Sequence, residues 1–295
     1  MRHAGKNASG AGSTRPTVSV IVPALNEAAN LPLVLRRIPA VHEVILVDGG
    51  SVDDTVAVAR QVLPAIQVVE QTRRGKGNAL SCGFAAATGE IIVMIDADGS
   101  TDPGEIPQFV DALLDGADYA KGSRFGSTGG SADITRLRRM GNAVLNGLVN
   151  VVFGTRYSDL CYGYNAFWAD CLTVFDLDPG SPARADGQFR WGDGFEIETL
   201  LNLRAARGGL VIREVDSFEH CRVHGESKLH AGTDGLRVLR TIAREWARRR
   251  PVPLSDDTRQ RRGVHDRPSR TPVPVTRQVE RPVETVSSVG IGQAS

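Results

Sequence analysis

Short runs of apolar residues alternate with segments of helical periodicity in the first hundred residues of this chain. The first run, 18–22, is β-branched except for Ser19 and ends at Pro23. Such runs are typical of strands buried on both faces of a sheet. The segments between them repeat apolar residues every three or four positions, as helices do. We predict strands at 18–22, 44–47, 66–70 and 90–95, and helices at 28–38, 54–63 and 78–87.

This alternation predicts an α/β fold with a mainly parallel sheet flanked by helices. In such sheets ligands bind beyond the carboxyl ends of the strands. Three of the predicted strands are followed there by polar or acidic segments, at 23–27, 48–51 and 96–98. We therefore expect a binding site along this edge of the sheet.

The two ends of the chain differ in composition from the rest. Residues 1–16 are rich in Gly, Ser and Ala, and residues 251–295 contain six prolines among Arg, Ser, Thr and Val. Prolines at this density exclude helices and central strands. We predict a disordered leader at 1–16, one domain over 17–250 and a disordered tail at 251–295.

The last predicted helix, 236–250, is amphipathic, with apolar residues on one face and arginines on the others. The simplest interpretation is a terminal helix that docks its apolar face on the domain and leaves a basic face in solvent. The alternative is contact with anionic lipid. The apolar residues are Leu236, Leu239, Ala243 and Trp246.

The charge balance limits the classes of partner. The chain has 35 basic and 34 acidic side chains, and a net charge of +1 argues against a nucleic-acid-binding protein. Both ends are basic, so the segment 17–250 is mildly acidic. The sequence has no apolar run long enough for a membrane span and no apolar signal segment. Its four cysteines are widely spaced, which favours free thiols and a cytoplasmic protein.

The strongest chemical signal is the pair Asp96 and Asp98, which directly follows the predicted strand 90–95. Two carboxylates two residues apart are able to bind one Mg²⁺ or Mn²⁺ and leave coordination positions open for diphosphate oxygens. The alternative is a turn in which the Asp side chains bond the backbone. The position after an apolar strand favours the metal site.

Two further segments suit a phosphorylated ligand. In 47–55, Asp48 precedes two glycines that permit close approach of a ligand, although another Asp of this segment also suits a helix cap. In 73–80, glycines alternate with cations ahead of a predicted helix. The second segment is neither a P-loop nor a dinucleotide-binding fingerprint, because the required Ser/Thr and the third Gly are missing.

Taken together and in order, these motifs resemble those of the family 2 glycosyltransferases, which have the GT-A fold. The resemblance covers roughly 17–235 and rests on VSVIVPALNE, VDGGSVDDT, GKGNA and DADGSTDP. The chain most resembles the polyprenyl-phosphate (dolichyl-phosphate) mannosyl- and glucosyltransferases. The segments that support this subgroup are KGSRF at 121–125, RMGN to DLCYGYN at 139–165, and EV with HCRVHGESK at 214–228.

The resemblance implies a nucleotide-sugar site at the edge of the sheet, where cations and a metal neutralise the departing diphosphate. It implies Mg²⁺ or Mn²⁺ on Asp96 and Asp98, with His224 as a third ligand from a loop. The residues implied for donor binding are Pro23, Leu25, Glu27, Asp48, Lys76, Asp96, Ala97 and Asp98. Those implied around the phosphates of donor or acceptor are Arg124, Arg139, Arg222 and Lys228.

A catalytic base is expected in the segment 191–198, WGDGFEIE, ahead of a predicted helix at 196–207. Many members of the family use an acidic residue near this position to take the proton of the acceptor hydroxyl. By that resemblance Asp193 is the first candidate and Glu196 the second. The alternative is that one of them caps the helix. An acceptor that is already an anionic phosphate needs no base.

The sequence therefore predicts a metal-dependent, inverting transfer of a GDP- or UDP-linked sugar to polyprenyl phosphate, by a cytoplasmic enzyme peripheral to the membrane. One alternative is transfer to a small soluble acceptor, because PALNE and GKGNAL also resemble the retaining glucosyl-3-phosphoglycerate synthases. The GESK segment near 225–228 favours the lipid acceptor. A second alternative is a non-catalytic nucleotide-sugar-binding module, against which the Asp96/Asp98 pair argues.

Overall fold

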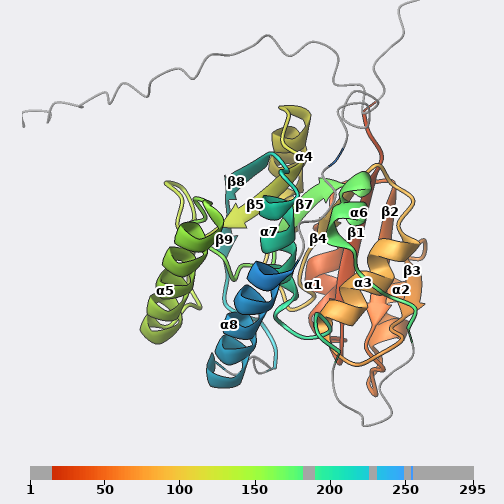
Figure 1. The fold of residues 1–295 in the computed structure, drawn as a ribbon. Helices are drawn as coiled ribbons and strands as arrows, with labels where there is room; N and C mark the ends of the chain where they lie inside the picture. The colour runs from red at the N-terminus through yellow and green to blue at the C-terminus, as the bar shows by residue number, and fades with distance from the viewer. Residues whose placement is uncertain (1–14, 182–189, 226–230, 249–253, 255–295) are drawn as a thin grey trace, which may run out of the picture. The chain divides into compact units, whose positions relative to one another are not determined.

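A seven-stranded sheet forms the centre of the computed structural model (Figure 1), which describes residues 15–181, 190–225, 231–248 and 254. The strand order is β3–β2–β1–β4–β7–β5–β8, and β7 is antiparallel to both of its neighbours while all other pairs are parallel. The α/β fold with a mainly parallel sheet is confirmed. The strands are β1 (Val18–Ala24), β2 (Glu43–Asp48), β3 (Gln67–Glu70), β4 (Ile91–Met94), β5 (Tyr119–Ser123), β7 (Asn165–Trp168) and β8 (Ile212–Asp216).

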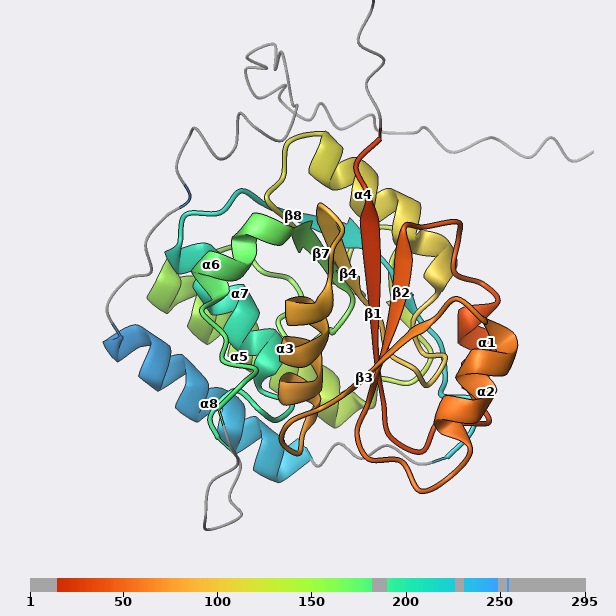
Figure 2. The ribbon, with the colours of Figure 1, turned by 90° about the vertical axis from the view of Figure 1, so that its right-hand side faces the viewer.

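Helices cover both faces of this sheet. Figure 2 shows α3, α6 and α7 on one side of the sheet and α1, α2 and α4 on the other. A short ribbon of β6 (Gly130–Ser131) and β9 (Phe218–Glu219) is separate from the main sheet. The helices are α1 (Leu31–Leu35), α2 (Thr55–Val62), α3 (Lys76–Ala86), α4 (Ile106–Leu114), α5 (Arg136–Phe153), α6 (Leu172–Phe175), α7 (Ile197–Arg207) and α8 (Ala231–Ala247), with 3₁₀ turns η1 (Pro103–Glu105) and η2 (Ala169–Cys171).

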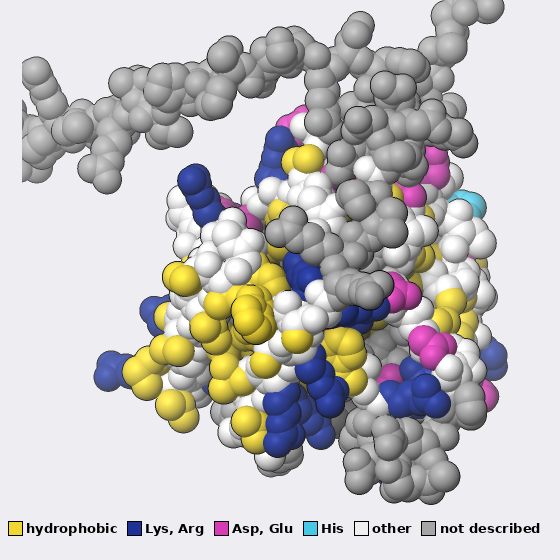
Figure 3. Space-filling model, viewed as in Figure 1, with side chains coloured by type: hydrophobic (Ala, Val, Ile, Leu, Met, Phe, Trp, Pro, Cys, Tyr) yellow, Lys and Arg dark blue, Asp and Glu magenta, His cyan; other side chains and the backbone are white. Residues whose placement is uncertain are grey.

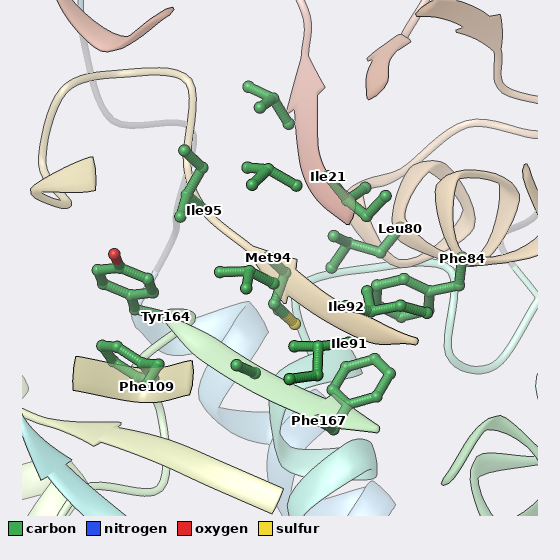
Figure 4. Packing of buried hydrophobic residues seen from close by; sticks show 14 of the residues in the cluster. Ile21, Leu80, Phe84, Ile91, Ile92, Met94, Ile95, Phe109, Tyr164 and Phe167 are labelled. Carbon is green, nitrogen blue, oxygen red and sulfur yellow. The ribbon is translucent and has the colours of Figure 1, made fainter. Parts of the chain in front are cut away.

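The hydrophobic core fixes the position of α3 on the sheet (Figure 4). Phe84 of α3 packs edge-to-face on Phe167 of β7, with 5.3 Å between ring centroids. A Cβ built at Gly83 would lie 2.4 Å from a methyl carbon of Ile21, so only glycine allows this close approach of α3 to β1. Because α3 is anchored here, its first turn has a fixed position beside the carboxyl ends of β1 and β4.

Helix α8 packs through the opposite face to the one that we predicted. Thr241 accepts a hydrogen bond from the indole of Trp191 over 3.2 Å, and Glu245 lies 3.1 Å from Nε of Arg204. These partners allow polar side chains to be buried together with Val238 and Ile242. The helix does pack on the domain, but the predicted face was wrong, because all four residues of the apolar stripe are exposed: Leu236, Leu239, Ala243 and Trp246.

The predicted leader and tail fall almost wholly outside the described residues, so their predicted disorder stays a prediction. None of the helices among the described residues combines the length and the apolar character needed to cross a bilayer.

Candidate active site

A cavity of about 800 Å³ opens at the carboxyl ends of β1 and β4, beside the first turn of α3. Further lining residues come from α5, α7 and α8 and from the loops around Arg124, Tyr162 and Arg222, so segments distant in the sequence enclose one space. All of the predicted donor-binding residues except Asp48 line this cavity: Pro23, Leu25, Glu27, Lys76, Asp96, Ala97 and Asp98.

Lys76 joins two carboxylates from distant parts of the chain. Its Nζ lies 2.6 Å from Oδ1 of Asp96 and 2.7 Å from Oε1 of Glu198. Burial opposes the charged ammonium, but the two carboxylates raise the pKa of Lys76 above its ordinary value. Burial raises the pKa of Glu198, although Lys76 acts in the opposite direction. A positive charge is therefore maintained in the cavity wall.

Arg222 joins a second pair of carboxylates. Its Nη2 lies 2.9 Å from Oδ2 of Asp98, and its Nη1 lies 3.0 Å from Oε1 of Glu27. The other oxygen of Glu27 accepts a hydrogen bond from the amide of Asn30 over 2.6 Å. Burial opposes the charge of Arg222, and Asp98 and Glu27 raise its pKa nonetheless. The segment after β9 is thus tied to the ends of β1 and β4.

Asp48 lies behind the cavity wall rather than in it. Its carboxylate accepts hydrogen bonds from the backbone amides of Gly50 and Ser51, over 3.0 and 3.1 Å. Gly50 has a φ of +82°, which favours glycine. Gly49, which lies between Asp48 and Gly50, lines the cavity. In this structure Asp48 fixes the turn that presents Gly49.

The acidic pair fits a hard divalent cation by its chemistry, because both carboxylates follow a buried strand and line the cavity. In this structure these carboxylates bind protein groups: Oδ1 of Asp98 accepts a hydrogen bond from the Ser100 hydroxyl over 2.6 Å. Among the described residues no three His, Cys, Asp or Glu side chains are grouped to hold a metal. His224 is exposed and bonds Asn30 only through its backbone, at 3.0 and 3.1 Å. The metal role of His224 stays a prediction.

Arg124 is buried against two carboxylates. It forms a bidentate pair with Asp159, at 2.7 and 2.9 Å, and its Nη1 lies 3.0 Å from Glu219. Burial opposes its charge, but Asp159 and Glu219 raise the pKa of Arg124. Burial alone would raise the pKa of Asp159, whereas Arg124 lowers it below its ordinary value. Arg124 lines the cavity with its charge already balanced.

The structure places the other predicted phosphate-binding cations differently. Arg139 is exposed, stacks 5.5 Å from the Phe125 ring centroid and does not line the cavity. Arg138, one position earlier, does line it and pairs with Asp133 over 3.0 Å. Lys228 lies outside the described residues.

Both oxygens of Asp193 and one oxygen of Glu196 bind protein groups, whereas Oε2 of Glu196 is buried without a hydrogen-bond partner among the described residues. Both oxygens of Asp193 bind Arg73, at 2.8 and 2.9 Å, and its backbone carbonyl accepts from Gly77 of α3 over 2.8 Å. Oε1 of Glu196 accepts from the backbone of Gly192 over 3.0 Å. Neither residue lines the cavity at the sheet edge. Their role as a base stays a prediction that this geometry does not favour.

Glu198 is the acidic residue of the segment 191–198 that lines the cavity. The sequence did not indicate Glu198, because no local pattern shows that it pairs with Lys76, which is more than a hundred residues away along the chain. Arg138 was likewise missed, since a one-residue shift on a helix turns a side chain by about 100°. The sequence offered one signal for each: Glu198 is two residues from the predicted Glu196, and Arg138 is next to the predicted Arg139.

An acidic cavity balanced by cations at the carboxyl edge of this α/β sheet is the arrangement of a GT-A glycosyltransferase. The sequence model described as glycosyl transferase family 2 matches residues 19–176. The chain belongs to this family.

Curated relatives include lipid-phosphate enzymes. The chain is 34% identical over 74% of its length to an uncharacterized glycosyltransferase of Mycobacterium tuberculosis, of which it covers 92%. It is 32% identical over 82% of its length to polyprenol monophosphomannose synthase of Mycolicibacterium smegmatis, of which it covers 93%. It is 31% identical over 78% of its length to undecaprenyl-phosphate mannosyltransferase of Micrococcus luteus, of which it covers 96%.

Solved structures with this fold include glucosyl-3-phosphoglycerate synthase from Mycobacterium tuberculosis. Its complex with UDP is 26% identical, with a TM-score of 0.60, and the match covers 81% of this chain and 82% of that one. Its complex with Mn²⁺, UDP-glucose and glycerol 3-phosphate is 25% identical with the same TM-score and coverage.

Proposed function

We propose that this enzyme transfers a sugar from a GDP- or UDP-linked donor to polyprenyl phosphate, with inversion and with Mg²⁺ or Mn²⁺, at the cytoplasmic face of a membrane. The observation that carries the proposal is one cavity with two unlike walls. The ends of β1 and β4 supply its acidic wall. Leu137 and Leu145 of α5 and Val238 of α8 supply an apolar wall.

The acidic wall suits a nucleotide sugar. The residues Pro23, Leu25 and Ala97 would flank the nucleoside, and Asp48 would hold the Gly49 turn beside it. Lys76 and Arg222 lie in the wall beside Asp96 and Asp98, where a diphosphate would need neutralisation. A divalent cation on the acidic pair would stabilise the charge of the departing diphosphate.

The opposite wall suits a lipid phosphate. Arg138 lies at the cavity beside Leu137, so a phosphate and an apolar chain would find partners on one helix. An oxygen of this phosphate would attack the anomeric carbon of the sugar, and the nucleoside diphosphate would leave. Because the nucleophile is already an anion, no general base is needed, and Glu198 would keep its ion pair with Lys76. The relatives named for polyprenol and undecaprenyl phosphate support this acceptor.

The second candidate is transfer to a small phosphorylated acceptor. The similarity to glucosyl-3-phosphoglycerate synthase, solved with phosphoglyceric acid and with glycerol 3-phosphate, favours it. The apolar wall of the cavity argues for the lipid, since a small polar acceptor gains nothing from Leu145 or Val238.

Two measurements test this proposal. A thermal-shift panel of nucleotide sugars with Mn²⁺ identifies the donor, because bound ligand raises the melting temperature. Transfer of that sugar is then measured with polyprenyl phosphate and with 3-phosphoglycerate as competing acceptors. We expect product on the polyprenyl phosphate; product on 3-phosphoglycerate alone would establish the second candidate instead.

A further inference from the structure

Helix α5 exposes an apolar face although it is packed in the domain. Its buried side rests on the cluster that includes Val149, Leu203 and Ile242. On another side, residues spaced by three or four positions share one face of the helix and point to solvent. They are Leu137, Met140, Val144, Leu148 and Val151, of which Val151 is 85% and Val144 66% exposed.

Helix α8 exposes a second apolar face beside the first. α5 and α8 pack against each other, and Figure 3 shows apolar and basic side chains gathered over both. Leu236, Leu239 and Trp246 are exposed on α8, and Trp246 is 69% exposed. Such contiguous exposed apolar faces mark an interaction surface rather than ordinary solvent contact. We name these eight residues of the two helices the α5/α8 face.

The charges around this face have one sign. Helix α5 contains three arginines and no acidic residue. The acidic residues of α8 are Asp234 and Glu245, and both are buried. The exposed charged side chains of the two helices are Arg136, Arg139, Arg240 and Arg244. Just before α5, the exposed Asp133 pairs with Arg138 over 3.0 Å. An apolar face whose own two helices expose only cations is complementary to an anionic lipid surface.

The α5/α8 face is also continuous with the cavity. Leu137 belongs to the exposed face and lines the cavity, and Gly235, next to Leu236, lines it from α8. A surface seated on this face would therefore lie at the cavity mouth. We propose that the α5/α8 face docks the enzyme on an anionic bilayer and so delivers the lipid acceptor to the cavity. The delivery rests on the proposed function, whereas the docking does not.

Vesicle co-sedimentation of the full chain tests the docking without any sugar donor. We expect the wild type to bind vesicles of phosphatidylglycerol and phosphatidylcholine in equal parts and to bind pure phosphatidylcholine far less. Val144→Glu/Val151→Glu removes the apolar contact, and Arg136→Glu/Arg240→Glu reverses two charges. Each pair should lower the partition coefficient about tenfold or more. The loss in the charge variant should shrink at high salt.

A matched control places the same new charges elsewhere. Leu33 of α1 and Val211 before β8 are 44% and 43% exposed and belong to neither α5 nor α8, and Leu33→Glu/Val211→Glu should bind vesicles as the wild type does. Circular dichroism and the melting temperature establish that each variant is folded. If Val144→Glu/Val151→Glu unfolds, the docking is tested by Arg136→Glu/Arg240→Glu, which changes only exposed arginines.

The docking would be overturned if the wild type did not bind anionic vesicles, or if all variants bound them equally. It would also be overturned if no form bound vesicles and the wild type were a dimer that Val144→Glu/Val151→Glu dissociates. The last would make the face a subunit interface. Vesicle binding as expected without sugar transfer to polyprenyl phosphate would leave the docking standing and remove the proposed function. Transfer to polyprenyl phosphate in detergent without vesicle binding would remove only the docking.

Discussion

Arg222 donates to Asp98 across the cavity wall, with 2.9 Å between Nη2 and Oδ2. The same guanidinium reaches Glu27. A divalent cation that binds Asp98 must compete with this arginine, so the loop that carries Arg222 and the acidic pair are energetically coupled.

The first prediction is that Arg222→Gln tightens Mn²⁺ binding to the ligand-free enzyme while it weakens sugar transfer. Removing the competing cation should lower the Kd for Mn²⁺ several-fold, since an opposite charge at this distance contributes about 1 kcal/mol or more. Mn²⁺ binding is measured by electron paramagnetic resonance. Arg60→Gln on the exposed face of α2 is the control. Unchanged Mn²⁺ affinity in Arg222→Gln would show that the arginine and the metal do not share Asp98.

The second prediction concerns the pairing of Lys76 with Glu198, which are 2.7 Å apart. Lys76→Met leaves two carboxylates in the wall without their cation and should lower the free energy of unfolding by about 3–5 kcal/mol. Glu198→Gln in the same chain should recover part of this loss, because one uncompensated charge is removed. Urea unfolding of the two single variants and the double variant measures the coupling. Additive losses would contradict it.

The third prediction separates a structural role of Asp193 from a catalytic one. Asp193→Asn breaks the buried bidentate pair with Arg73 and should cost about 3–5 kcal/mol of stability. At a temperature where the variant is folded, we expect kcat to change less than tenfold and its pH profile to keep its shape. Asp111→Asn, on the exposed side of α4, is the control. A loss of a hundredfold or more in kcat of the folded variant would make Asp193 the base.

The fourth prediction follows from the lowered pKa of Asp159. A carboxyl whose folded pKa is below its unfolded value of about 3.9 stabilises the fold above that pH. This contribution is lost as the pH falls through the folded pKa. The wild type should therefore exceed Asp159→Asn in stability by about 3–5 kcal/mol at pH 7, and the difference should shrink below about pH 4. Thermal unfolding as a function of pH measures it, and a constant difference would contradict it.

The sequence was informative where local pattern decides the structure. The apolar runs before Pro23 and Asp96 became β1 and β4, and the residues that follow them line one cavity. The pairing of Lys76 with Glu198, and of Arg124 with Glu219, joins segments that no periodicity relates. Such contacts arise only from tertiary packing.

Helix α8 shows a second limit of sequence patterns. Its apolar stripe through Leu239 and Trp246 was visible, but the pattern does not say which face is buried. Arg204 and Trp191 supply polar partners for Glu245 and Thr241, and these contacts make the polar face the packed one. The apolar stripe is therefore exposed to solvent.

The central claim is that Asp98 acts in metal-dependent transfer from a nucleotide sugar, and turnover of Asp98→Ala tests it most directly. With the donor found in the thermal-shift panel, we expect the wild type to form glycosyl polyprenyl phosphate with Mn²⁺ and to lose this activity on chelation. Folded Asp98→Ala should form at least about a hundredfold less product per unit time at any Mn²⁺ concentration. Undiminished turnover of Asp98→Ala, or of the wild type after chelation, would contradict the account.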